Sequence, residues 1–107
     1  AQKGESDLRR RIDLVNLYED HIVLHRSRSN KLYKRSRANL MNNIIAIFRL
    51  HYSGLYSTRK EKFRELKRAF LRHYIVSLTE SNPHLSRKLL ASWFLFVLSP
   101  KLYLKYT

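Results

Sequence analysis

Cysteine is absent from the sequence, which excludes disulfides and metal sites built on thiolates. Glycine and proline are scarce, with two of each in 107 residues. The chain therefore lacks the frequent turn signals that a many-stranded β sandwich needs. Long hydrophobic runs are missing too, because the run from Leu89 to Leu98 would form a helix of about 15 Å, half the hydrocarbon thickness of a bilayer. We expect helices, none of which spans a membrane.

Acidic residues are also scarce. Eight Asp and Glu stand against 22 Lys and Arg, which gives a net charge of +14, and no acidic residue follows Glu80. Such a balance predicts an anionic partner, which can be a nucleic acid, an acidic membrane surface or an acidic protein. The polar start of the chain has no signal-peptide pattern. Because the sequence begins at Ala1 without a methionine, we expect a trimmed chain or a piece of a longer protein.

Hydrophobic residues make up 44% of the chain and recur at helical spacing. They predict one basic all-α domain that covers residues 1–107. We expect four amphipathic helices and a short C-terminal one, at about 7–25, 30–53, 59–78, 85–98 and 100–106. The third of these has a broad apolar face, which consists of Phe63, Leu66, Phe70, Leu71, Tyr74, Ile75 and Leu78.

Local signals suggest where the helices begin and end. Ser6 and Asp7 can cap the first helix, and Gly54 can end the second. The pair Thr58 and Glu61 forms a capping box before the third helix. Ser99-Pro100 fits an N-cap followed by proline at the first helical position.

The sequence shows no catalytic constellation. It contains no glycine-rich phosphate loop and no paired D-x-D acids. His21 and His25 are four residues apart and can reach one metal ion, but no third ligand accompanies them at a useful spacing. We expect no catalytic residue, no metal and no cofactor in this chain.

Basic and aromatic residues are the candidates for binding. Basic residues flanking a short apolar segment with Trp and Phe are typical of an interfacial membrane anchor. The residues expected to contact an anionic surface are Arg26, Arg28, Lys31, Lys34, Arg35, Arg37, Arg87, Lys88, Lys101 and Lys105. The residues expected to form the interfacial apolar and aromatic part are Trp93, Phe94, Phe96, Tyr103 and Tyr106. The sequence does not decide whether Leu89–Leu98 is core or surface.

The ending Ser99-Pro100-Lys101-Leu102-Tyr103 resembles the C-terminal tails of bacterial family 2 glycosyltransferases, which build surface polysaccharides from nucleotide sugars. Asp7–Leu24, Asn42–Tyr56 and Arg59–Leu71 are similar to the helices that follow the catalytic domain in that family. The resemblance implies a C-terminal accessory segment of such an enzyme. The sugar-nucleotide and metal sites would lie in an α/β domain outside this sequence, so no catalytic residue carries over.

Three functions follow as hypotheses. The first is a non-catalytic glycosyltransferase module that holds the enzyme on the inner, cytoplasmic face of the membrane, assembles its subunits, or does both. The second is a basic helical protein that binds nucleic acid, although no helix-turn-helix spacing with a glycine turn supports base recognition. The third is a pure oligomerisation domain, in which Leu89–Leu98 packs against a second copy or against the missing catalytic domain.

Overall fold

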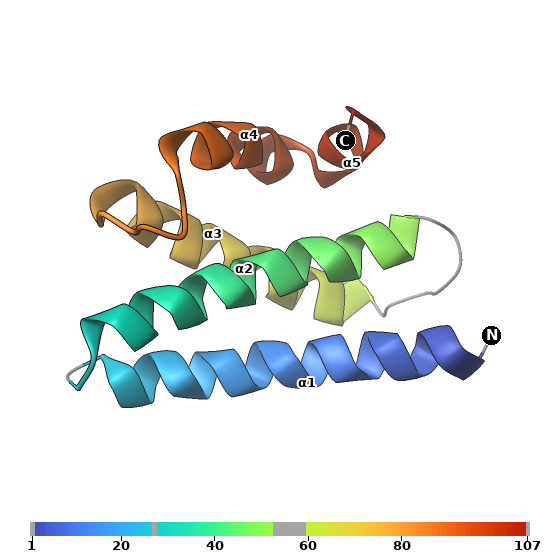
Figure 1. Cartoon of the computed structure of the whole chain (residues 1–107). Coiled ribbons are helices and arrows are strands. Elements are labelled where there is room, and N and C mark those ends of the chain that lie inside the picture. Colours follow the sequence, from blue (N-terminus) through green and yellow to red (C-terminus); the bar gives the residue numbers. More distant parts are fainter. Residues whose placement is uncertain (1, 27, 53–59, 107) are drawn as a thin grey trace.

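The computed structural model describes residues 2–26, 28–52 and 60–106, and the side chains of residues 9–26, 28–52 and 60–105. Its helices are α1 (Gln2–His25), α2 (Asn30–Tyr52), α3 (Lys60–Thr79), α4 (Arg87–Leu98) and α5 (Pro100–Tyr106) (Figure 1). No strand occurs within these ranges. The predicted all-α class and the order of four longer helices and a short terminal one are confirmed.

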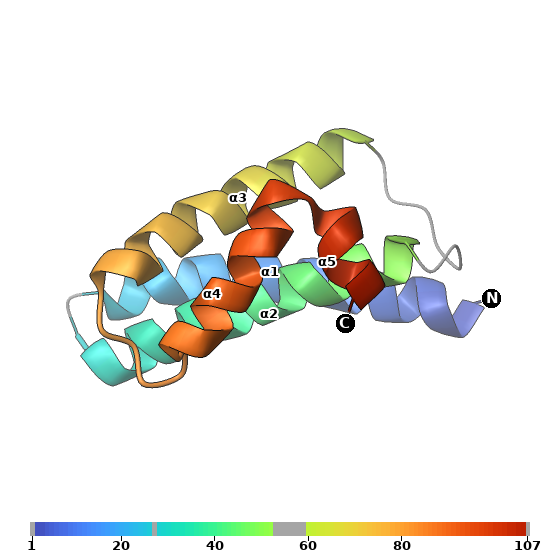
Figure 2. The same cartoon turned by 90° about the horizontal axis from the view of Figure 1, so that it is seen from above.

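The helices stack in layers around α2. Helix α1 runs along one side of α2 over most of its length, while α3 lies beside α2 and α4 crosses above the two (Figures 1 and 2). Helix α5 turns back from α4 to contact α2. Because α2 has neighbours on several sides, it contributes the largest share of the fully buried residues, which include Leu40, Met41, Ile44, Ile47 and Phe48.

Aromatic rings fill the space between α2, α3 and α4. The ring of Phe96 meets the rings of Phe48 and Phe70 edge to face, with centroid distances of 5.1 and 4.6 Å. Trp93 packs on Phe70 at 5.6 Å and is 1% exposed. Edge-to-face pairs add about 0.5–1.5 kcal/mol each to the effect of burial. This cluster therefore fixes α4 against α3 and decides which face of α4 looks outward.

A serine side chain caps the N-terminus of each of three helices. Ser86 Oγ accepts the backbone N–H of Leu89 at 3.1 Å at the start of α4. Ser99 Oγ accepts the N–H of Leu102 at 3.4 Å, and Pro100 is the first residue of α5. The predicted Ser99-Pro100 start is confirmed. Before α2, Ser29 Oγ accepts the N–H of Leu32 at 3.3 Å.

Other predicted boundaries differ or are untested. Helix α1 begins at Gln2, so Ser6 and Asp7 lie within the helix and do not cap it. The helix extends to Gln2 because Gln2, Lys3 and Glu5 are good helix formers, which offsets the low helix propensity of Gly4. Gly54 and Thr58, the expected end of α2 and start of the capping box, lie outside the described residues. Within the described part of the chain, no helix is both long and apolar enough to cross a membrane.

Candidate anionic-surface interface

The basic run expected between residues 26 and 37 lies at the turn that joins α1 to α2. Helix α1 ends at His25, whose carbonyl accepts the N–H of Ser29 at 3.0 Å. This closed turn places the exposed side chains of Arg26, Arg28, Lys31 and Arg35 around one end of the molecule, with Lys34 half-buried beside them. The turn therefore gathers like charges that a straight helix would distribute around its circumference.

The first turn of α4 lies at the same end of the molecule (Figure 2). Asn82, which is buried in the segment between α3 and α4, donates from Nδ2 to the carbonyl of Lys34 at 3.0 Å. Its Oδ1 accepts the N–H of His84 at 2.9 Å. These bonds hold the segment against α2, so the exposed Arg87 and Lys88 lie near the α1–α2 turn. We call this set the basic corner: Arg26, Arg28, Lys31, Lys34, Arg35, Arg87 and Lys88.

Exposed aliphatic side chains accompany these cations. Val23 is 76% exposed, and Leu24 and Leu32 are also on the surface. Val23 and Leu32 lie at helical spacing from other apolar residues of their helices, but the core does not reach them. Ile22, Val23 and Leu24 span roughly 200° of a helix at 100° per residue, so one neighbouring helix cannot cover all three. The run from Ile22 to Leu24 could therefore have predicted an exposed apolar patch near the turn.

Arg37, the last residue of the predicted basic run, points inward and is 4% exposed. Its Nη1 lies 3.2 Å from Nδ1 of His73, and its Nη2 donates to the hydroxyl of Tyr33. Its Nε faces Oε2 of Glu80 at 3.9 Å, beyond hydrogen-bond range. Arg37 is thus part of the packing between α2 and α3 and is not available to an external anion.

His73 continues this network to α1. Its Nε2 lies 3.2 Å from Oε1 of Glu19, which also pairs with Arg72 at 3.7 Å. Because an arginine can only donate, Nδ1 of His73 must accept and Nε2 must carry the proton. Burial lowers the pKa of His73, an effect that Glu19 opposes, whereas the positive charges of Arg37 and Arg72 reinforce it.

The spacing of α2 could have located Arg37. It precedes Met41, Ile44 and Phe48 by four, seven and eleven residues, and all three are buried. Positions at this spacing share one helix face. The composition of the basic run suggested a surface role for Arg37, but its place in the helical period indicates the core.

The remaining expected cations lie at another place. Lys101 and Lys105 are exposed on α5, where they line a shallow hollow of about 380 Å³ together with Arg49, Tyr52 and Leu104. Arg49 and Tyr52 belong to the C-terminal end of α2, and α5 lies beside that end of the helix, opposite to its first turn (Figure 2). The structure therefore does not unite the ten expected contact residues in one surface.

The expected interfacial aromatic residues are mostly internal. Trp93, Phe96 and Tyr103 are buried in the core, so in this fold their rings are not available for shallow insertion. Phe94 is 53% exposed. Tyr106 is the last residue of α5, and its side chain lies outside the described residues. Consecutive residues of a helix face different directions. Trp93 and Phe96 of α4 therefore face the core, whereas Phe94 between them faces outward.

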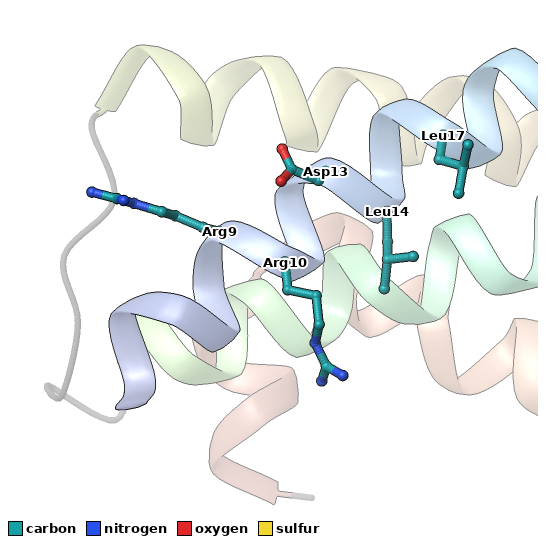
Figure 3. Close-up of a pocket in the computed structure, with 5 residues that line it drawn as sticks. All are labelled: Arg9, Arg10, Asp13, Leu14 and Leu17. Atoms are coloured by element: carbon teal, nitrogen blue, oxygen red, sulfur yellow. The ribbon is translucent and has the colours of Figure 1, made fainter. Parts of the chain in front are cut away.

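A further hollow of about 530 Å³ lies on α1 and is lined by Arg9, Arg10, Asp13, Leu14 and Leu17. All five residues come from one helix, and the charged ends of Arg9, Arg10 and Asp13 point in different directions (Figure 3). Groups that diverge in this way do not form a reaction site. In the ranges that the structure describes, no three His, Asp or Glu residues come together to hold a metal ion.

Comparison with protein-family models, with curated proteins and with solved structures found no match to this chain. The glycosyltransferase family that the tail sequence resembles therefore stays a prediction.

Proposed function

We propose that this chain is a non-catalytic helical module that docks on an anionic membrane surface through the basic corner. The observation that carries the proposal is the gathering of exposed Lys and Arg side chains around exposed aliphatic ones at one end of the fold. Electrostatic attraction to acidic headgroups and burial of a few apolar side chains are the two contributions that peripheral membrane binding combines.

The magnitude is sufficient for useful binding. Each Lys or Arg close to an acidic membrane surface is worth about 1 kcal/mol. Arg26, Arg28, Lys31 and Arg35 alone then contribute about 4 kcal/mol, close to a thousandfold in partitioning. Val23, Leu24 and Leu32 add burial of apolar area, which salt does not screen.

The composition of the corner favours lipid over nucleic acid. Single-stranded nucleic acid is held by aromatic side chains that stack on bases. In the described part of the chain, Tyr52 and Phe94 are the large exposed aromatic residues, and neither belongs to the basic corner. The exposed apolar neighbours of its cations are aliphatic, which suits acyl chains better than bases.

The host protein is inferred from the resemblance of the tail. As the C-terminal segment of a bacterial family 2 glycosyltransferase, the module would hold the catalytic domain at the inner face of the cytoplasmic membrane. Subunit assembly is the additional role that the resemblance allows.

Sedimentation with vesicles tests the proposal. The chain is mixed with phosphatidylcholine vesicles with and without phosphatidylserine over a salt series. A corner variant carries Arg26→Gln, Arg28→Gln, Lys31→Gln and Arg35→Gln. The matched control carries Lys60→Gln, Arg64→Gln, Lys67→Gln and Arg68→Gln, which removes the same charge from exposed positions of α3.

We expect the corner variant to bind phosphatidylserine vesicles about a hundredfold to a thousandfold more weakly, and the control to lose much less. Equal losses in both variants would mean that only the net charge matters, and the corner would not be a docking site. Stronger salt-resistant binding to duplex DNA than to vesicles would transfer the function to nucleic acid.

A further inference from the structure

Helix α3 exposes an apolar stripe that the core leaves uncovered. Leu71, Ile75 and Leu78 follow one another at intervals of four and three residues, and Leu78 is 59% exposed. The apolar face predicted for this helix is therefore wider than the surface that α2 and α4 cover. Exposed apolar residues that line up along a helix, in contrast to scattered ones, mark a contact surface.

Helix α4 carries a second exposed stripe. Ala91, Phe94 and Leu98 lie on its outward face, at intervals of three and four residues. Leu78 from α3, and Ala91 and Phe94 from α4, line a common groove of about 960 Å³. The α3 stripe thus meets this groove at Leu78, whereas Leu71, Ile75 and Leu98 do not line it.

The groove has a fixed floor. Tyr74, buried at its base, donates from its hydroxyl to the carbonyl of Leu90 at 2.7 Å. Leu85 and Leu90 are also buried among the lining residues. The bond from Tyr74 to Leu90 links α3 to α4 directly at the base of the groove, and such a link suits a preformed binding site.

Arginine is the charged residue that accompanies both stripes. Arg64 and Arg68 extend the α3 stripe toward its N-terminus, and Arg87 begins the α4 stripe. All three are exposed. Glu80 lines the groove, but its carboxylate faces the buried Arg37 guanidinium. The apolar surface is therefore bordered by positive charge at its ends.

We propose that the α3 stripe and the groove that it meets at Leu78 together bind an amphipathic helix of a partner protein, with apolar side chains facing this surface and Asp or Glu on its flanks. The distance along α3 from Arg64 to Leu78 corresponds to about 21 Å, or about 14 residues of a partner helix. Such a helix uses anchors spaced by three and four residues, as in other helix-in-groove complexes. The proposal does not depend on the membrane role of the basic corner.

The charge disfavours a second copy of this chain as the occupant. Each copy carries +14, and an antiparallel pair would bring the same arginine-bordered stripes together. Like charges across an interface oppose association, while acidic flanks opposite Arg64, Arg68 and Arg87 would form ion pairs. The concave shape also suits a rod-like helix better than the flat surface of a bilayer.

Binding of designed peptides tests the proposal by fluorescence anisotropy. The probe is a helical peptide of about four turns with leucines at positions i, i+4, i+7 and i+11 and glutamates on both flanks. A second peptide keeps the leucines and replaces each glutamate with lysine. The groove variant is Leu78→Ser with Phe94→Ser, and the matched control is Val23→Ser with Leu24→Ser, four exposed positions at which folding is not at risk.

We expect the glutamate peptide to bind the native chain and the control variant equally, and to bind the groove variant at least tenfold more weakly. The groove variant retains every charge, so this loss cannot come from nonspecific attraction. Equal binding of both peptides, no binding of either, or unchanged binding to the groove variant would overturn the proposal.

Two further results would assign the groove to another occupant and so also overturn the proposal. Light scattering that shows a dimer of the native chain and a monomer of the groove variant would identify a second copy. Loss of vesicle binding in the groove variant, with retention in the corner variant, would identify a lipid-facing surface and would contradict the function proposed for the corner as well.

Discussion

Replacement of Arg37 by methionine tests the buried network around Arg37 without changing any residue of the basic corner. Methionine has a similar length but no charge and no donor. Nδ1 of His73 then loses its bond to Nη1, and a buried acceptor without a partner costs about 1–3 kcal/mol. Oε2 of Glu80 also loses the cation 3.9 Å away; this oxygen is buried, although the Glu80 side chain as a whole is 31% exposed. We expect a decrease of about 2–4 kcal/mol in the free energy of unfolding.

The neighbouring Arg35 provides the matched control, because it has the same chemistry and lies two residues away on the surface. Arg35→Met should change the free energy of unfolding by less than about 0.5 kcal/mol. With an m-value of about 2 kcal/mol/M in urea, in the middle of the usual range for small proteins, Arg37→Met should lower the midpoint by about 1–2 M. Circular dichroism at a helical wavelength follows both transitions.

Vesicle binding is a second readout, in which we expect the effect in Arg35→Met and not in Arg37→Met. Arg35→Met should weaken binding to phosphatidylserine vesicles about fivefold, which corresponds to about 1 kcal/mol. Arg37→Met should leave it unchanged under conditions in which the chain is folded. If the two variants shift the urea midpoint equally, Arg37 is not the centre of a buried network and the argument for its inward position fails.

Three further variants test the packing that positions the site. Burial lowers the pKa of His73 in the folded chain, so the unfolded chain takes up the proton first as the pH falls. The native chain should therefore lose stability below about pH 6.5. The His73→Gln variant should lack this part of the pH dependence. Trp93→Ala should cost about 3–5 kcal/mol and Phe94→Ala less than about 1 kcal/mol, since the first is buried and the second exposed. Asn82→Ala should cost about 1–3 kcal/mol through the lost bond to Lys34.

Urea denaturation measures all three effects, and each has an outcome that contradicts its basis. An unaltered pH dependence in His73→Gln would place the proton uptake on another histidine. Equal costs for Trp93→Ala and Phe94→Ala would mean that α4 is rotated about its axis. A neutral Asn82→Ala would show that the segment before α4 does not depend on its link to α2.

The sequence predicted the helices because the signals that form them are local. Apolar spacing of three and four residues identifies a helix without knowledge of its neighbours. Ser99-Pro100 defines the start of α5 from two adjacent residues, one as the cap and one as the first helical position. The start of α1 was missed because serine and aspartate occur inside helices as well as at their caps.

Whether an individual side chain is buried or exposed could not be predicted in the same way, because this depends on helices that are distant in the sequence. Arg37 is buried since His73 of α3 and Glu80, the residue that follows α3, reach it from 36 and 43 positions further along the chain. Leu78 is exposed since α4 crosses α3 at the level of Tyr74 and does not extend over it. Sequence patterns therefore indicated which faces are apolar but not how much of each face the core covers.

Arg87 connects the two proposed surfaces, since it belongs to the basic corner and also lines the groove between α3 and α4. An acidic helix that pairs with Arg87 removes one cation from the corner, which is worth about 1 kcal/mol at an acidic membrane, or about fivefold in affinity. Thermodynamic linkage requires that the membrane weaken binding of the helix by the same factor. The two occupants would therefore compete through one shared arginine, although their apolar contacts lie on separate faces.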